Sequence, residues 1–459
     1  MPALAGPLTL QEALELAARH NIEVWLAAQQ RKVEQELATH SLLKMLPSLL
    51  AGGESSRRSE YEASSSESLA TGQESLEPSF SSEKEVNRWD VSGIWNLLDF
   101  GISYLRARQQ ANRVLIAAER ERRVRQNLAL EVTRTWWQAV TAREVARQAD
   151  ELAERVAAAL DKLGRQVAEK AISEVDGLKR ETMLLEQQEE LERYKRSYLA
   201  AKAELAALIG LPPGADLSLA EVDLEQPPSP AEFDVEELER EALRRRPELY
   251  EKDLEEAISR DEARLALAQM LPSVSLFWRF DHDNNRYLAF KHWHTAGIRA
   301  SWDLLTIPQQ LAHHGALKHQ TELVIRQRLA VAVAILTQLQ LALIDYTDTA
   351  ERLTLARAIA DRHQALLLAL QSAAGEGKSH GGETLDQELK ALKARARYLT
   401  GYAALMTAEA RVWSTIGRDV SAASSKPRPT TIAPSAAEGP EAGVEIGTTT
   451  QPCDSQPAP

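Results

Sequence analysis

An internal duplication limits the possible folds of this chain more than any other feature of its sequence. Trp-Asn-Leu-Leu at 95–98 corresponds to Trp-Asp-Leu-Leu at 302–305, and Ile-Gly at 209–210 corresponds to Ile-Gly at 416–417. Both correspondences have an offset of 207 residues. Two copies of one unit therefore run in register from the tryptophan to the closing glycine.

Before the tryptophan the offset is larger. Met-Leu-Pro-Ser stands at 45–48 and again at 270–273, 225 residues later, so the first copy has 18 extra residues between Pro47 and Trp95. This segment is rich in Glu and Ser, a composition that is typical of a solvated loop.

Each copy follows the order helix, strand hairpin, long helix, turn, helix. The helices that the apolar periodicity predicts are Leu10 to Lys44, Ile102 to Val167, Glu174 to Ile209, Val235 to Met270, Pro308 to Gln371 and Leu385 to Ile416. In each copy the first and last helices together match the long helix between them in length. We therefore expect the two shorter helices to stack end to end beside the long one, over about 100 Å.

The apolar seams of the long helices are narrow, with spacings of three and four residues as in coiled coils. The seam positions are Val145, Ala149, Leu152, Val156, Leu160, Leu163 and Val167, and Leu336, Leu339, Leu343, Tyr346, Ala350 and Leu353. The most apolar stretch, Leu329 to Ile344, is interrupted by Thr337, Gln338 and Gln340. It is shorter than a membrane-spanning helix requires, so we expect a buried helix there.

Between the helices the periodicity changes to alternation. Val274, Leu276, Trp278 and Phe280 share one face of an expected strand, and most residues of the other face are polar. Strands of about ten residues with one apolar face suit a water-filled barrel in lipid, although a small soluble β-domain would alternate in the same way. Four strands are too few to enclose a channel, whereas three chains would supply about twelve.

Charge and cysteine content exclude other classes of function. The net charge of −13 argues against a nucleic-acid partner. Seven arginines between 106 and 125 are interleaved with Glu119 and Glu121, which indicates a solvated or salt-bridged helix face. The only cysteine is Cys453, so one chain cannot build a disulfide framework or a thiolate metal site. The sequence shows no catalytic constellation, and we expect no enzyme activity, no cofactor and no bound metal.

The order and duplication of these motifs resemble the TolC family of outer-membrane efflux factors. The similar segments are Leu-Thr-Leu-Gln-Glu-Ala-Leu at 8–14, Leu-Pro-Ser at 46–48 and 271–273, Trp-Asn-Leu-Leu-Asp-Phe-Gly at 95–101 and Leu-Ile-Gly-Leu-Pro at 208–212. The resemblance covers about Leu8 to Gly417. Two residues depart from it: Ile22 replaces a proline that is common in the family, and Lys170 replaces a glycine expected before the first tip turn.

The resemblance implies a mainly α fold with a small β part. Two tandem repeats of helix, β-hairpin, long helix and helix would form an α-helical coiled-coil barrel and lend four strands to a trimeric 12-stranded β-barrel. The expected bounds are 8–217 for the first repeat with a hairpin at about 48–100, 234–418 for the second with a hairpin at about 273–305, and 421–459 for a disordered tail rich in Pro, Thr, Ser and Ala.

The implied function is an outer-membrane channel, an efflux duct for export, with its helices in the periplasm. It would act as a homotrimer in outer-membrane lipid. A periplasmic adaptor (membrane fusion) protein and an inner-membrane efflux pump would open this passive conduit.

Candidate functional residues form three groups. The candidate gate consists of Glu383, Asp386 and Asp176, which three chains would bring near the threefold axis, where carboxylates favour cations. These carboxylates are equally explained as charges that stabilise helix N-termini. The candidate adaptor-docking residues are Glu169, Lys170, Ser173, Gly375, Gly377 and Ser379. The candidate membrane-interface aromatics are Trp95, Trp278, Trp293 and Trp302.

Two other functions stay open: a non-transporting coiled-coil scaffold, and the efflux adaptor itself, which also has helical hairpins. The complete repeat occurs twice and no lipoyl-like β-domain is visible, which disfavours the adaptor. Met1 to Leu8 shows no export signal, which a duct needs. An export signal in the sequence upstream of Met1 would favour the duct over the scaffold.

Overall fold

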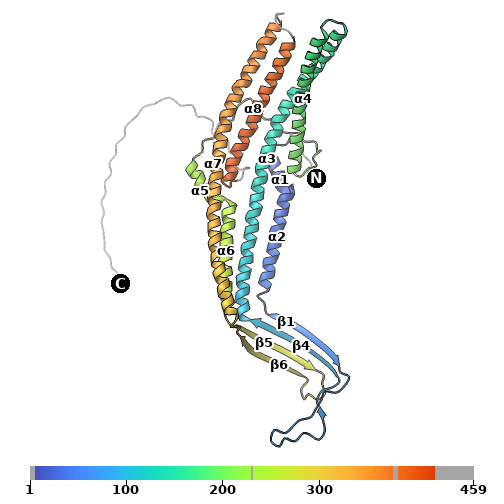
Figure 1. Cartoon of the computed structure of the whole chain (residues 1–459), viewed down its shortest axis with the longest axis vertical. Coiled ribbons are helices and arrows are strands. Elements are labelled where there is room, and N and C mark those ends of the chain that lie inside the picture. The colour runs from blue at the N-terminus through green and yellow to red at the C-terminus, as the bar shows by residue number, and fades with distance from the viewer. Residues whose placement is uncertain (1–5, 229–230, 376–380, 419–459) are drawn as a thin grey trace, which may run out of the picture. The chain divides into compact units, whose positions relative to one another are not determined.

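The computed structural model describes residues 6–228, 231–375 and 381–418, which lie in one compact unit (Figure 1). The helices are α1 (Leu10–His20), α2 (Ile22–Leu43), α3 (Leu97–Ala168), α4 (Glu174–Leu208), α5 (Val235–Arg245), α6 (Pro247–Ala268), α7 (Thr306–Gly375) and α8 (Gly381–Thr415). The strands are β1 (Ser48–Arg57), β2 (Ala63–Ser64), β3 (Ser79–Phe80), β4 (Glu85–Asn96), β5 (Ser273–Asp283) and β6 (His292–Ser301). The mainly helical fold with a small sheet is confirmed, and the tail expected at 421–459 lies outside the described residues.

Two long helices organise the repeats. The 72 residues of α3 and the 70 of α7 each extend over about 105 Å at 1.5 Å per residue. α2 and α4 follow one another along α3, as α6 and α8 follow one another along α7 (Figure 1). α3 also packs against α6 and α8, so the two repeats share one core. The predicted stacking of short helices beside a long one is confirmed.

The first helix of each copy is divided into two, which the sequence analysis did not predict. Asn21 and Arg246 are equivalent in the two copies, and both have extended backbone (ψ 132° and 125°). The Asn21 side chain accepts a hydrogen bond from the backbone N–H of Glu23 and so caps α2, and Pro247 begins α6. Ile22 therefore keeps the break without the proline of the family, because Asn21 caps the new helix.

Each repeat ends at a glycine in the left-handed region. Gly210 has a φ of 78° and Gly417 a φ of 77°. A Cβ at Gly210 would lie 2.8 Å from the carbonyl oxygen of His20, and one at Gly417 would lie 2.9 Å from that of Arg245. His20 and Arg245 are equivalent residues, so both copies close the end of their last helix against the same turn.

Four strands form one antiparallel sheet in the order β1-β4-β5-β6, at one end of the helices (Figure 1). The hairpins pair through β4 and β5, where Val91 stands opposite Phe280. This pairing leaves β1 and β6 as the edges of the sheet. β1 is a regular strand from Ser48 to Arg57 although its own sequence alternates poorly.

The first hairpin carries an extension between β1 and β4. Its base is the two-residue ladder of β2 and β3, in which Ala63 stands opposite Phe80. Tyr61 stacks on Phe80 with ring centroids 4.4 Å apart. Beyond this ladder, Leu69 and Leu76 are fully exposed. The extra residues of the first copy thus form a small solvated hairpin.

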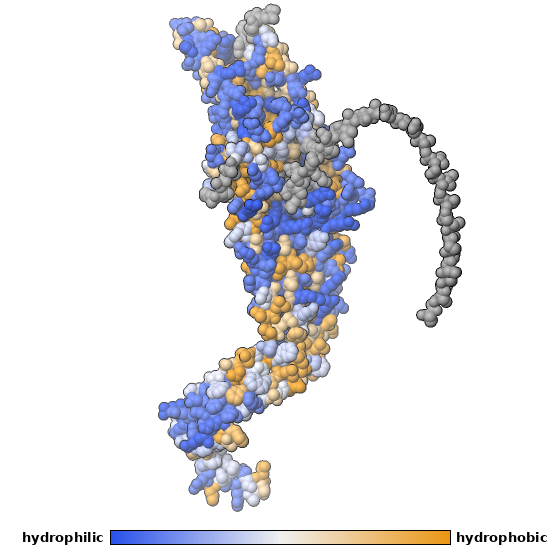
Figure 2. Space-filling model, turned by 180° about the vertical axis from the view of Figure 1, so that it is seen from behind, coloured by the Kyte–Doolittle hydropathy of each residue, from blue (hydrophilic) through white to orange (hydrophobic). Residues whose placement is uncertain are grey.

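The apolar stretch of α7 was predicted to be buried, but most of it is exposed in the single chain. An 18-residue window of α7 is apolar enough to cross a membrane by length and composition, with a mean hydropathy of 1.7, and only 22% of that window is buried. The exposed fractions of Val333 and Ile344 are 64% and 63%. The prediction was wrong for a single chain because this stripe faces away from α6 and α8. Figure 2 shows apolar surface gathered over the helix ends next to the sheet.

Candidate functional site

The two faces of the sheet differ in chemistry. Residues that stand opposite one another in an antiparallel ladder point to the same side, so the register assigns every side chain to a face. One face carries Leu49, Ala51, Gly53, Trp89, Val91, Gly93, Trp95, Val274, Leu276, Trp278, Phe280, Ala296, Ile298 and Ala300, with the polar residues Ser55, Asn87, His282, His292 and His294 at the end far from the helices. Leu49 and Ile298 on this face are 74% and 72% exposed. An apolar face left open to this extent needs a cover that a single chain does not supply.

The opposite face is polar and its charges are largely paired. It carries Glu54, Arg88, Asp90, Ser92, Asn96, Ser275, Arg279, Asp281, Thr295 and Arg299, together with four large apolar residues, Leu50, Ile94, Phe277 and Trp293. Arg88 forms an ion pair with Asp283 at 2.7 Å, and Arg279 forms one with Asp281 at 2.9 Å. Such a face suits contact with water.

Phe277, which interrupts the alternation in the sequence, lies on this polar face. A Cβ at Gly297 would come within 2.8 Å of the Phe277 ring, so the ring lies over a glycine. The Arg299 guanidinium stands 5.3 Å from the ring centroid. The exception to the pattern is therefore accommodated by its cross-strand neighbours.

The four candidate interface tryptophans do not share one face. Trp95 and Trp278 lie on the apolar face. Trp293 stands opposite Asp281 and so lies on the polar face. Trp302 follows β6, and its indole N–H donates to the carbonyl oxygen of Met270 at 3.0 Å. An interfacial role stays a prediction for these residues, and the register favours it for Trp95 and Trp278 only.

Each edge strand of the sheet is joined to a helix with an exposed side. α2 leads into β1, and β6 leads into α7. α2 carries exposed apolar residues that are four, seven and four residues apart and so share one side of the helix, namely Ile22, Leu26, Val33 and Leu37. Leu329, Val333, Leu341 and Ile344 of α7 are likewise exposed on one side of their helix. Each side of the unit thus joins an edge strand with free backbone groups to an exposed apolar helix stripe.

The first helix tip is a tight turn between α3 and α4. Glu169 caps the end of α3, and Lys170 has a φ of 55°, the conformation for which glycine is favoured. The Ser173 hydroxyl accepts from the backbone N–H of Asp176 at 3.2 Å, so Ser173 caps α4. A Cβ at Gly177 would lie 2.6 Å from Cγ2 of Val167, which shows how closely the two helices approach.

The second tip is only partly described. Gly375 ends α7, while Gly377, Ser379 and the Glu383 side chain lie outside the described residues. Asp386 lies near the start of α8, where its carboxylate forms an ion pair with Lys390 at 2.7 Å. The two described candidates for a gate, Asp176 and Asp386, both stand close to a helix N-terminus, so the macrodipole explanation of their charge stays open.

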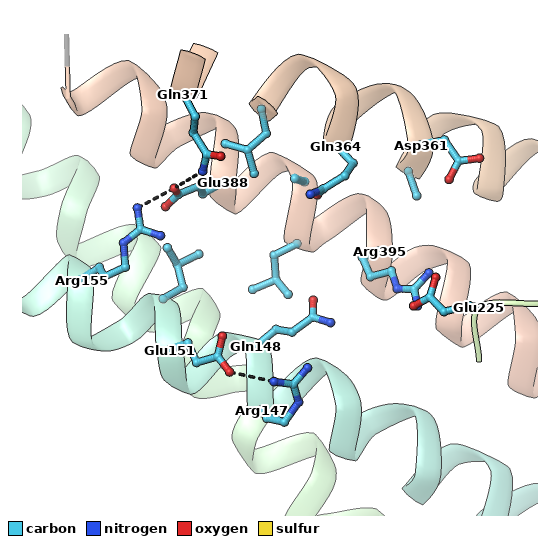
Figure 3. Close-up of a pocket in the computed structure, with 15 residues that line it drawn as sticks. Arg147, Gln148, Glu151, Arg155, Glu225, Asp361, Gln364, Gln371, Glu388 and Arg395 are labelled. Carbon is cyan, nitrogen blue, oxygen red and sulfur yellow. Dashed lines mark hydrogen bonds and ion pairs between the residues drawn. The ribbon is translucent and has the colours of Figure 1, made fainter. Parts of the chain in front are cut away.

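A polar cleft of about 560 Å³ lies between α3, α7 and α8 (Figure 3). Its arginines are ion-paired: Arg147 with Glu151, Arg155 with Glu388 and Arg395 with Glu225. Gln371 of α7 donates to the same Glu388 carboxylate at 3.3 Å. Arg155 belongs to the first repeat and Glu388 to the second, so the cleft is a polar seam between repeats. Sequence spacing could not reveal it, because its residues are far apart in the chain.

Among the described side chains, no group of three or more His, Cys, Asp or Glu residues is placed to hold a metal ion. The candidate functional features that the structure describes are four surfaces: the apolar face of the sheet, its polar face, its two edges and the helix tips.

No family model matches the chain, and no curated protein matches it in sequence. Solved structures do match it over most of its length. The outer-membrane channel OprN aligns with a TM-score of 0.69 and 17% identity, covering 90% of each chain. The open state of the MtrE outer membrane channel of Neisseria gonorrhoeae aligns with a TM-score of 0.69 and 15% identity, covering 90% of this chain and 89% of that one.

CusC, whose structures describe transmembrane channel formation, aligns with a TM-score of 0.70 and 14% identity, covering 91% of this chain and 95% of that one. At these identities the likeness concerns the fold. The chain has the fold of these outer-membrane channels, the TolC-type fold that its duplicated motifs indicated.

Proposed function

We propose that the chain is one subunit of a homotrimeric outer-membrane duct for export. The observation that carries the proposal is the sheet, with one exposed apolar face, one polar face and two free edges. In lipid, a backbone with free edges is stable only when the sheet closes into a barrel. Closure would turn the apolar face toward lipid and the polar face toward a water-filled lumen.

Ring closure explains both edges at once. β1 runs away from the helices and β6 runs back toward them, so β6 of one chain can pair with β1 of the next in an antiparallel ladder. The same contact brings the α7 stripe of one chain against the α2 stripe of the next. A head-to-tail contact of this kind closes into a ring. Three chains then supply twelve strands, a barrel wide enough for a lumen.

The fold supports the place of this duct in the cell. OprN and MtrE are outer-membrane channels, and each aligns with 90% of this chain. We place the sheet in the outer membrane and the helices in the periplasm, where the tips would meet a periplasmic adaptor and an inner-membrane efflux pump. The solved structures of similar fold are channels, which supports a passive conduit without enzyme activity.

The helix tips are the proposed gate and docking region. Docking would involve Glu169, Lys170 and Ser173 at the first tip, and Gly375, Gly377 and Ser379 at the second. Glu383, Asp386 and Asp176 would form the cation-favouring ring of the gate. Neutralising Glu383 and Asp386 together should weaken cation selectivity in bilayer recordings. Unchanged reversal potentials would remove the gate assignment.

The proposal is tested by expressing the chain behind an export signal. We expect it in the outer membrane, extracted by detergent as a trimer that conducts ions in planar bilayers. Val333→Asp places a charge in the α7 stripe and should abolish the trimer. The control is Leu243→Asp on α5, where the leucine is also exposed but lies outside the proposed contact. A chain that stays water-soluble, monomeric and non-conducting would instead favour the scaffold function.

A further inference from the structure

The basic stretch of α3 contains two arginines that the structure leaves unpaired. Five of its seven arginines form ion pairs: Arg108 with Asp261, Arg120 and Arg123 with Glu251, Arg122 with Glu119, and Arg125 with Glu121. Most of the stretch is therefore a salt-bridged helix face, as its interleaved acids indicated. Arg106 and Arg113 are the exceptions.

Both side chains are exposed, and within residues 6–228, 231–375 and 381–418 neither has a carboxylate within ion-pair distance. Arg113 donates only to the side-chain oxygen of Gln110, at 3.1 Å. The acids of the neighbouring helices are engaged elsewhere. Glu262 of α6 accepts from Gln109, and Glu34 of α2 accepts from Gln110. No carboxylate of the described residues thus neutralises the positive charge of Arg106 and Arg113.

The two arginines lie on one face of α3 because they are seven residues apart, which is about two helical turns. Arg120, a further seven residues on, continues this face and is paired with Glu251. A second series with the same spacing, Arg108, Leu115 and Arg122, is offset from the first by two residues. Two residues correspond to about 200°, so the second series lies on the opposite face.

The second series marks the outer side of the wall. Arg122 donates to the backbone carbonyl oxygen of Arg245, at the end of α5, at 2.7 Å. α1 packs against α3 and α5 packs against α7, about halfway along these long helices (Figure 1), and segments at this place would obstruct a tunnel if they lay inside it. The face of Arg122 is therefore outside the proposed duct, and the face of Arg106 and Arg113 is inside.

We infer that Arg106 and Arg113 line the tunnel and make the part of it next to the sheet selective for anions. This inference rests on the proposed trimer, in which six guanidinium groups would stand around the lumen. Arginine keeps its charge at every physiological pH. A wall of one charge raises the local concentration of the opposite ions, so this part of the tunnel would concentrate anions although the proposed gate at the helix tips favours cations.

The polar face of the sheet next to these arginines carries charges of both signs. Arg88 and Arg279 each form an ion pair with an aspartate, and the Arg299 guanidinium stands over the Phe277 ring. Arg106 and Arg113 add charge of one sign where the lumen passes from strands to helices. At about 0.15 M salt the Debye length is about 8 Å, so these charges act on ions near the wall and more strongly at low salt.

The test compares Arg106→Gln/Arg113→Gln with wild type as full-length trimers in planar bilayers under a KCl gradient. We expect the Cl⁻/K⁺ permeability ratio to fall about twofold or more in the double variant, and more at low salt. Arg106→Lys/Arg113→Lys keeps the charge and should keep the ratio. Arg244→Gln removes an exposed arginine from α5, on the outer side, and should leave the ratio unchanged.

A second measurement, of polyanion binding, does not depend on recording an ion current. The polyanion inositol hexaphosphate is titrated into the detergent-solubilised trimer by calorimetry, and the double glutamine variant should bind it about tenfold more weakly than wild type. A conducting trimer whose permeability ratio and polyanion binding match those of Arg244→Gln would overturn the inference while leaving the duct intact. A wild-type protein that forms no trimer would overturn the duct and the inference with it.

Discussion

The two strand hairpins occupy equivalent places in their repeats but are built differently. β5 and β6 are joined directly between Asp283 and His292, and β5 brings Leu276, Trp278 and Phe280 to the apolar face. β1 and β4 are separated by the extension with β2 and β3. β1 brings only Leu49 and Ala51 to the same face, with Gly53 beyond them.

The apolar face is therefore assembled by the pairing of strands in the sheet, and a single strand need not have a regular apolar pattern of its own. β1 has a weak pattern of its own, but its register on β4 sets Leu49 opposite Gly93 and Ala51 opposite Val91. The large side chains of this face come from β4 of the first hairpin and β5 of the second, where Trp95 stands opposite Leu276. The hairpins are therefore expected to be equal in their membrane placement and unequal in their loops.

The largest expected effect comes from placing a charge on the apolar face of either hairpin. Leu276→Arg on β5 and Val91→Arg on β4 should each destabilise the folded trimer by about 2–4 kcal/mol, because the guanidinium would have to enter lipid. The measurement is the denaturant midpoint of the trimer in detergent or lipid. The controls are Ser275→Arg and Ser92→Arg, next to these residues but on the polar face. They should lower the stability of the trimer only slightly.

A similar loss for Leu276→Arg and Val91→Arg would show that both hairpins are inserted to the same extent. If Val91→Arg behaved like Ser92→Arg while Leu276→Arg was damaging, the first hairpin would stand outside the membrane, and the comparison would fail.

The helical part was largely predictable because its signals are local. Apolar spacing of three and four residues fixed the seams along α3 and α7, and the duplicated Ile-Gly pair fixed the ends of the repeats. Asn21 shows the limit of this approach. Its role as the cap of α2 depends on one side-chain hydrogen bond, which a continuous apolar pattern conceals.

The candidate site was less predictable because it depends on contacts between distant segments. The face of Trp293 follows from its pairing with Asp281, not from its own neighbours in sequence. The apolar stretch of α7 indicated burial, whereas its position at an edge leaves Val333 exposed. Arg106 and Arg113 differ from the other five arginines of the basic stretch only in that they lack a carboxylate partner among the described residues.

The closing glycines offer the next test, since the two repeats should respond alike. Gly210→Ala and Gly417→Ala force a left-handed conformation on alanine, which alone costs about 1–2 kcal/mol, and bring a Cβ against a carbonyl oxygen. Thermal unfolding should show a similar loss for both. Gly214→Ala has open space around its Cβ and serves as the control. A loss in one repeat only would mean that the two turns are not equivalent in energy.

A smaller effect of opposite sign is expected at the first tip. Lys170 has a φ of 55°, so Lys170→Gly should relieve the conformational cost and stabilise the turn by up to about 1 kcal/mol. Lys170→Ala keeps the strained conformation and should be close to wild type. Hydrogen exchange of the amides in the last turn of α3 would report the local gain. Equal exchange in the glycine and alanine variants would contradict the strain.

The smallest effect should follow from removing the feature that most distinguishes the hairpins. Replacing the 14 residues 65–78 by seven residues of Gly and Ser would halve the loop between β2 and β3 and keep the stack of Tyr61 on Phe80. Halving the loop changes its closure entropy by only about 0.6 kcal/mol, so trimer stability should stay within about 0.6 kcal/mol of wild type. Phe80→Ala removes the stacked pair and should cost more, about 0.5–1.5 kcal/mol. A trimer that dissociates after the loop replacement would show that the extension contacts a neighbouring subunit, and the hairpins would then differ in assembly as well as in sequence.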